Sequence, residues 1–314
     1  MIYLLYIVVA ALIVILSTKA SDYVDLLDKK TSLSGAFIGG VMLSAVTSLP
    51  ELFTSISSTL FLDEPGLAIG NILGSNLFNV AMLSVIVILT FTPFLKGKLS
   101  KSHGKVTIFV GLIYLAMVLN MLNVLSFEIL TVNITSILIV ILYIIGIKSM
   151  STASSPESES EDTSPLTVKQ ISVRFVLVSL VIISSSIAIT YITDEIATIH
   201  NLGAGLAGAL FLGIATSLPE LASTVALFKK RSFDIAFGNI VGSNIFNFVI
   251  LGLTDILYIG GGVYDFSDTK TQALLIFGTI ATPFMYLLIK TKKKWLKFAC
   301  PVCIVLCYVM FLVY

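Results

Sequence analysis

The chain has 314 residues, of which 57% are hydrophobic and 12% charged, with 19 Lys and Arg against 18 Asp and Glu and a mean hydropathy of +1.03. A soluble domain carries about 25% charged residues and about 45–50% apolar ones. The composition therefore predicts an integral membrane protein in contact with the lipid bilayer. It excludes a membrane-anchored soluble enzyme, because the apolar runs leave no room for a soluble domain, and the net charge of +1 argues against a nucleic-acid-binding protein.

Long apolar runs bounded by charged residues predict an all-α polytopic protein with ten transmembrane helices, because one span takes about 20 mostly apolar residues. The first run lacks the basic leader and the small-residue cleavage site of a signal peptide, so we interpret it as a retained helix. The predicted spans are 1 to 18, 34 to 60, 67 to 92, 106 to 125, 127 to 147, 171 to 192, 203 to 228, 235 to 259, 271 to 289 and 295 to 313.

The basic residues predict the orientation of these spans. If the N-terminus lies outside, 18 of the 19 Lys and Arg residues fall in loops on the inner side and only Lys270 falls outside. The positive-inside rule then places both termini outside, in a multi-pass protein of the cell (plasma) membrane.

Residues 148–169 are the polar stretch of the chain, rich in Ser, Pro and Glu. They predict a flexible cytoplasmic linker between a first five-helix repeat, 1–147, and a second, 170–314. A regulatory segment, with phosphorylated serines or an acidic run that binds cations, is the alternative interpretation.

Two motifs occur once in each half. TSLPE at 47–51 recurs at 216–220, and GNILGSNLFN at 70–79 recurs as GNIVGSNIFN at 238–247. Two ordered motifs at nearly one offset indicate a duplication. Because each half has an odd number of predicted spans, the second copy enters the membrane from the opposite side, which predicts an inverted repeat with a shared site near the bilayer midplane.

Glu51 and Glu220 are the acidic residues that fall well inside apolar runs. A charge at the bilayer centre costs about 2.5–3.5 kcal/mol on insertion scales and marks an ion or substrate path by default. The alternative is a protonated glutamate that is hydrogen-bonded between helices. The same acid in the same motif of both halves favours the ion path.

The neighbours of each glutamate suit a metal cation. Thr47 and Ser48 lie four and three residues before Glu51, so they share its helix face. Pro50 leaves carbonyls one turn earlier without their usual donors, and a bound cation satisfies such carbonyls. A kink used only for packing is the alternative. The second copy repeats the arrangement with Thr216, Ser217, Pro219 and Glu220.

A polar stripe follows each glutamate motif at a spacing of four residues. The stripes consist of Asn71, Ser75 and Asn79 in the first half and Asn239, Ser243 and Asn247 in the second. Such stripes also form interhelical hydrogen bonds, which is the alternative to a cation path. Glycines predicted to let these helices approach closely are Gly39, Gly40, Gly70, Gly74, Gly205, Gly208, Gly238 and Gly242.

The candidate ligands are all oxygens. His103 and His200 lie near span ends and no cysteine flanks either motif, which excludes sites typical of Zn, Cu or iron–sulfur clusters. Carboxylate, carbonyl, hydroxyl and amide oxygens suit Ca²⁺ and Na⁺. Two glutamates neutralise one Ca²⁺ or two Na⁺, and a site filled by one or the other is typical of an exchanger.

At these residues the sequence resembles the cation/Ca²⁺ antiporter superfamily, and most closely the prokaryotic sodium/calcium exchangers. The resemblance implies alternating access, with spans 2, 3, 7 and 8 around the site and spans 1 and 6 sliding across it. It implies that Glu51 and Glu220 bind Ca²⁺ or Na⁺. The other implied ligands are Thr47, Thr216, Ser48, Ser217, Ser75, Ser243, Asn79 and Asn247.

One departure from the family pattern concerns the third acid. Many relatives carry an aspartate at the position of Asn79 or Asn247, whereas both are asparagine here. The pocket then holds two fixed carboxylates, which argues against the K⁺ co-transport of the K⁺-dependent branch.

The sequence thus predicts a secondary antiporter that extrudes Ca²⁺ in exchange for Na⁺, not an enzyme. Its predicted partners are Ca²⁺, Na⁺ and the lipid bilayer, with no cofactor, nucleic acid or required protein partner indicated. The alternatives are an H⁺-coupled Ca²⁺ antiporter of the same fold, a passive cation channel, and an intramembrane hydrolase, for which no catalytic arrangement of residues is visible.

Overall fold

The computed structural model describes residues 1–30, 43–151, 165–259 and 261–314. The first half contains α1 (Ile2–Lys30), α3 (Leu43–Thr47), α4 (Leu49–Leu60), α5 (Pro65–Leu89), α6 (Phe91–Phe94), α7 (Lys101–Met121), β1 (Glu128–Ile129), β2 (Val132–Asn133) and α8 (Ile134–Ser151). The second half contains α9 (Val168–His200), α10 (Ala204–Ala207), the π-helix η2 (Gly208–Leu212), α11 (Gly213–Lys229), α12 (Phe233–Leu257), α13 (Thr269–Lys290) and α14 (Lys294–Val313).

Eight helices of the described residues are long and apolar enough to cross a membrane. The apolar part of α8 is shorter, and α3 and α4 are short helices separated at Ser48. The fold class is therefore that of a helical polytopic membrane protein, as the composition predicts. The eight are α1, α5, α7, α9, the continuous α10–η2–α11 segment, α12, α13 and α14.

The boundary of the fifth predicted span is wrong at its start. Residues 127–133 were predicted to be helical, but they hold the antiparallel β1–β2 hairpin, and α8 begins at Ile134. Leu130 and Thr131 have φ of 52° and 72°, which a right-handed helix does not contain. The backbone N–H of Asn133 donates to the buried carboxylate of Asp255 (2.9 Å), so tertiary hydrogen bonding overrides the apolar composition here.

Parts of two other predictions lie outside the described residues. These parts are 34–42 of the second predicted span, with Gly39 and Gly40, and 152–164 of the predicted linker. The linker's ends are helical, because α8 continues to Ser151 and α9 starts at Val168 behind a capping box of Thr167 and Gln170.

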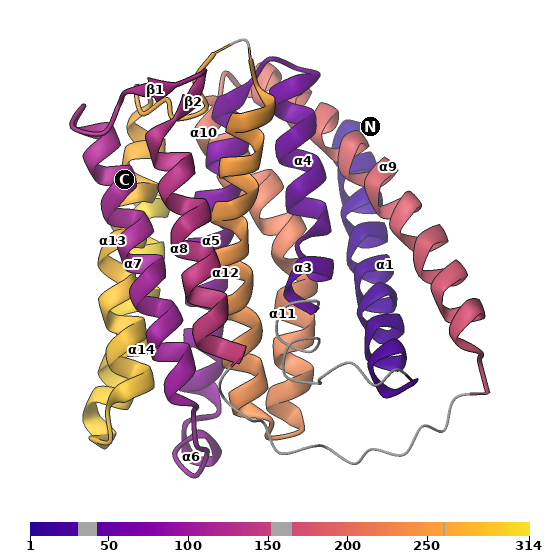
Figure 1. Cartoon of the computed structure of the whole chain (residues 1–314), viewed down its shortest axis with the longest axis vertical. Coiled ribbons are helices and arrows are strands. Elements are labelled where there is room, and N and C mark those ends of the chain that lie inside the picture. The colour runs from indigo at the N-terminus through magenta and orange to yellow at the C-terminus, as the bar shows by residue number, and fades with distance from the viewer. Residues whose placement is uncertain (31–42, 152–164, 260) are drawn as a thin grey trace.

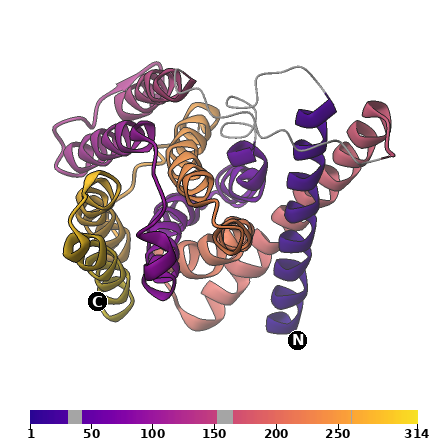
Figure 2. The same cartoon turned by 90° about the horizontal axis from the view of Figure 1, so that it is seen from below.

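The helices run roughly parallel to one long axis in a single bundle (Figure 1). Seen along that axis, α5, α11 and α12 occupy the middle, α7, α8, α13 and α14 lie on one side, and α1 and α9 lie together on the other (Figure 2). Both chain ends lie toward the upper end of Figure 1, with the β-hairpin, and α6 lies at the lower end.

Burial separates the middle of the bundle from its edge. The most apolar stretches of α5 and α12 are 67% and 72% buried, against 17% for α1 and 33% for α9. The main apolar core joins α5, α7, α12, α13 and α14, whereas α1 and α9 contribute to smaller separate clusters. The two stripe-bearing helices thus form the packed centre, and α1 and α9 form a thinly attached outer pair.

Close contact between α5 and the α10–η2 segment depends on small residues. A Cβ on Gly74 would lie 2.5 Å from the Cα of Ala209, and a Cβ on Gly208 would lie 2.4 Å from the carbonyl of Leu67. These backbones therefore touch without room for a side chain, as predicted for Gly74 and Gly208. Gly238 faces His103 on α7 instead.

We expect Gly74→Ala to destabilise the protein, because its methyl group meets backbone atoms that cannot move aside. Overpacking of this kind costs about 1–3 kcal/mol, enough to lower the Tm by several degrees. Thermal unfolding in detergent measures the effect. Gly111→Ala on α7 is the matched control, since its Cβ has ordinary contact at 3.5 Å; equal Tm values for the two variants would contradict the close-contact argument.

Candidate cation-binding site

Glu51 and Glu220 lie at the centre of the bundle, and both side chains are fully buried. Glu51 is in the first turn of α4, directly after the helix break at Ser48, and Glu220 follows Pro219 inside the continuous α11. The helix is thus interrupted near the proline motif in the first copy, whereas the second copy keeps a continuous helix preceded by the η2 π-turn.

Hydroxyl groups cross between the two halves to reach these carboxylates. Ser217 Oγ donates to Glu51 Oε1 and Ser48 Oγ donates to Glu220 Oε1, each at 3.3 Å. Ser48 is the N-cap residue of α4, but its side chain makes no capping bond and turns to the other half instead. The helical spacing predicts that each serine lies beside the glutamate of its own copy, whereas in the structure each serine donates to the glutamate of the other copy.

The threonines of the motif lie beside the same carboxylates. Thr216 lies beside Glu51, and Thr47 lies beside Glu220, again across the halves. Thr216 Oγ1 also donates to Asn71 Oδ1 on α5 (3.3 Å). Glu51 and Glu220 themselves are close enough for their charges to interact. The two motif copies therefore form one site and not two.

The polar stripes of α5 and α12 divide into three levels. At the first level, Asn71 Nδ2 donates to Thr54 Oγ1 (2.9 Å) and Asn239 Nδ2 donates to Ser223 Oγ (3.0 Å). These two asparagines hold α5 to α4 and α12 to α11, so interhelical hydrogen bonding, the alternative interpretation, accounts for their amide donors.

The second and third levels face the middle of the bundle. Ser75 Oγ donates to the carbonyl of Gly213 (3.2 Å), and Ser243 lies beside the Glu220 carboxylate. Asn79 and Asn247 donate across to asparagines of the opposite helix. All ten predicted site residues are buried, with at most 1% of any of them exposed.

Several buried oxygens at this place have no hydrogen-bond partner among the described residues. They are Glu51 Oε2, Glu220 Oε2, Ser243 Oγ and Asn247 Oδ1. Buried polar atoms are nearly always satisfied in folded proteins. Oxygens left open on carboxylate, hydroxyl and amide groups from both halves are the donor set that Ca²⁺ and Na⁺ prefer.

Sequence reasoning missed the roles of Asn76 and Asn244, the asparagines of the two GSN triplets. Each lies one residue beyond the serine of its stripe, about 100° around the helix, and so does not face the glutamates. Their identity in both motif copies could have marked them, but their contacts depend on how α5 and α12 cross.

Residues 1–150 and 171–314 match the family described as sodium/calcium exchanger protein. The chain belongs to this family. The inner membrane protein YrbG of Escherichia coli K12 is 26% identical to the exchanger over 253 residues, covering 69% of this chain and 67% of YrbG.

Two solved structures have a similar fold. The crystal structure of the H⁺/Ca²⁺ exchanger CAX aligns with a TM-score of 0.78 at 15% identity, covering all of this chain and 82% of CAX. The sodium–calcium exchanger NCX_Mj, soaked with Na⁺ and Sr²⁺, aligns with a TM-score of 0.64 at 20% identity, covering 100% of this chain and 99% of NCX_Mj. The exchanger therefore has a transporter fold, and its family is one of membrane antiporters.

We expect Ser48→Ala and Ser217→Ala to weaken Ca²⁺ affinity by similar factors, because the two hydroxyls make equivalent crossed bonds. Loss of a hydrogen bond to a charged group costs about 1.5–3 kcal/mol, or at least a tenfold rise in apparent KM. The measurement is ⁴⁵Ca²⁺ uptake into proteoliposomes over a range of Ca²⁺ concentrations.

Ser58→Ala is the matched control, since Ser58 is also buried on α4 but its hydroxyl donates to the backbone of Ser55. An unchanged KM in both site variants would contradict the crossed arrangement.

Proposed function

We propose that the exchanger carries Ca²⁺ in one direction and Na⁺ in the other across the cell membrane, using one central site. The observation that supports this most directly is the pair of fully buried carboxylates, Glu51 and Glu220, each contacted by hydroxyls of the other half. Neither has a basic partner among the described residues. Their combined charge matches one Ca²⁺ or two Na⁺.

The cations in this proposal bind to oxygens supplied by both halves. Glu51 and Glu220 provide the charge, and the neutral oxygens come from Thr47, Thr216, Ser48, Ser217, Ser75, Ser243, Asn79 and Asn247. Thr47 is the last residue of α3, so its carbonyl lies at the negative end of a short helix, where a cation is stabilised.

Alternating access requires that the site open to one side of the membrane at a time. In our proposal the chain has ten spans as two inverted five-helix repeats, with both termini outside and the linker in the cytoplasm. The outer pair α1 and α9 then moves across a fixed centre made of α4, α5, α11 and α12. Their position at one side of the bundle and their packing in small apolar clusters outside the main core support this role (Figure 2).

We expect Glu51→Gln and Glu220→Gln each to abolish Ca²⁺ exchange, because a neutral amide removes half the charge that offsets the cation. Both variants should still insert and fold, since Gln keeps the size of Glu and no longer buries a charge. ⁴⁵Ca²⁺ flux into proteoliposomes, with size-exclusion chromatography as the folding check, measures the outcome. Glu195→Gln, an exposed acid on α9, is the control and should be silent. Normal flux in either site variant would refute the assignment.

An H⁺-coupled Ca²⁺ antiporter is the second candidate, supported by the fold likeness to CAX and by carboxylate oxygens that can accept protons when Ca²⁺ leaves. The two candidates differ in their counter-ion.

We expect an outward Na⁺ gradient, with Na⁺ loaded inside the proteoliposomes, to drive ⁴⁵Ca²⁺ uptake at constant pH, and an inward Na⁺ gradient to drive none. The Glu51→Gln protein is the background control. Uptake that follows an imposed pH gradient and ignores Na⁺ would overturn the Na⁺ proposal and support the H⁺ alternative. Uncoupled flux with single-channel currents would support a channel.

A further inference from the structure

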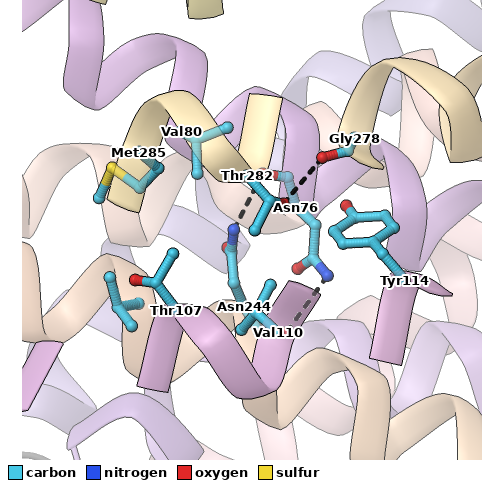
Figure 3. Close-up of a pocket in the computed structure, with 10 residues that line it drawn as sticks. Asn76, Val80, Thr107, Val110, Tyr114, Asn244, Gly278, Thr282 and Met285 are labelled. Carbon is cyan, nitrogen blue, oxygen red and sulfur yellow. Dashed lines mark hydrogen bonds between the residues drawn. The ribbon is translucent and has the colours of Figure 1, made fainter. Parts of the chain in front are cut away.

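Asn76 on α5 and Asn244 on α12 clasp each other where these two helices cross. Asn76 Nδ2 donates to the backbone carbonyl of Asn244 (3.2 Å), and Asn244 Nδ2 donates to the backbone carbonyl of Asn76 (3.0 Å). The two residues occupy equivalent positions of the two motif copies, and Figure 3 shows them pointing toward one another. We call these two residues the asparagine clasp.

The clasp fixes which way each of its amides points. A backbone carbonyl only accepts hydrogen bonds, so the atom facing it must be the nitrogen of the side-chain amide. The Oδ1 atoms of Asn76 and Asn244 are therefore directed away from the opposing carbonyls, and each is available only as an acceptor.

These two Oδ1 atoms in turn fix the amides of the predicted ligands. Asn247 Nδ2 donates to Asn76 Oδ1 (3.0 Å), and Asn79 Nδ2 donates to Asn244 Oδ1 (3.1 Å). The nitrogen of each ligand amide is thus held by the clasp, on the side of the opposite repeat. The remaining oxygen of Asn247 is buried and has no hydrogen-bond partner among the described residues.

We propose that Asn76 and Asn244 are positioning residues that hold the amide oxygens of Asn247 and Asn79 toward the transported cation. The proposal rests on the proposed function of the central site. An asparagine that is free to rotate also populates the orientation that directs its N–H groups into the site, and N–H repels a cation. The clasp removes that second orientation before the cation arrives.

These hydrogen bonds cross between the two halves of the chain, as the hydrogen bonds of the serine hydroxyls do. Asn76 in the first repeat orients the ligand of the second repeat, and Asn244 orients the ligand of the first. Residues that orient metal ligands typically change metal affinity by about 10-fold to 100-fold when they are removed. The clasp therefore makes the affinity of the single site depend on both repeats together.

Behind the clasp lies a cavity of about 20 Å³, lined by Asn76, Asn244, Tyr114, Thr107 and Thr282 among others (Figure 3). A space of this size holds about one water molecule. Residues of α7 and α13 therefore enclose the clasp on this side with little free space, which helps to keep its amides in one orientation.

A double-mutant cycle on ⁴⁵Ca²⁺ uptake into proteoliposomes tests the proposal. Asn76→Leu keeps the approximate shape of the side chain and removes its oxygen acceptor. We expect it to raise the apparent KM for Ca²⁺ by about 10-fold to 100-fold. In an Asn247→Ala background the same substitution should have no further effect on KM, because the ligand that it orients is already gone.

The matched control is the uncrossed pair. In an Asn79→Ala background, Asn76→Leu should still raise KM, since Asn79 is oriented by Asn244. Additive effects for Asn76 with Asn247, or the same coupling for the crossed and uncrossed pairs, would overturn the positioning role. A wild-type protein that moves no ⁴⁵Ca²⁺ in either a Na⁺ or a pH gradient would instead refute the proposed function.

A folding check separates a loss of ligand orientation from a loss of folding. If Asn76→Leu gives no monodisperse protein, Asn76→Ser replaces it. The serine side chain is polar, but its oxygen lies one bond nearer the backbone than Oδ1 and so cannot take the place of that acceptor. The mirror variant Asn244→Leu should be silent in the Asn79→Ala background. Loss of folding in all clasp variants, with Asn247→Ala still folded, would assign the clasp to stability and overturn the proposal.

Discussion

The rest of this structure depends on the burial of two carboxylates in the centre of an apolar bundle. An ionised carboxylate removed from water costs several kcal/mol unless opposite charge and hydrogen bonds offset it. Glu51 and Glu220 each receive crossed hydroxyl contacts, yet each keeps one oxygen without a hydrogen-bond partner among the described residues. In the proposed function the transported cation binds these carboxylate oxygens and offsets their negative charge. The same constraint explains why the candidate ligands around the two carboxylates are oxygen atoms.

The two copies of the motif together supply the hydrogen bonds that the buried carboxylates need. One half of the chain supplies a carboxylate and the other half supplies the hydroxyl that contacts it, so both halves contribute to the same place in the bundle. The clasp of Asn76 and Asn244 shows the same crossed pattern, since each of these asparagines accepts a hydrogen bond from the stripe asparagine of the other half. Crossed contacts of this kind tie the two halves of the chain together at the centre of the bundle. In the proposed function this centre stays fixed, so the moving parts of the transporter lie elsewhere.

In the proposed function these moving parts are α1 and α9. The central helices α5 and α12 are the most buried of the eight long helices among the described residues, and Gly74 and Gly208 bring backbones into direct contact. The outer pair α1 and α9 packs chiefly against itself and one face of the centre, through small apolar clusters. An interface with few interlocking side chains slides at lower cost than a close-packed core. A fixed site beside a mobile pair is the arrangement that alternating access needs.

The sequence by itself determined the membrane class, the family motifs, and the residue types of the candidate site. Hydropathy and the two copies of TSLPE and GSN carry that information locally, because span length and acid placement do not depend on neighbouring helices. Only the tertiary structure decided that Ser48 contacts Glu220 and not Glu51, that Asn247 donates to Asn76, and that 127–133 holds a hairpin. Each of these depends on how distant segments cross, and a hydrogen-bond partner more than 100 residues away leaves no periodic trace in the chain.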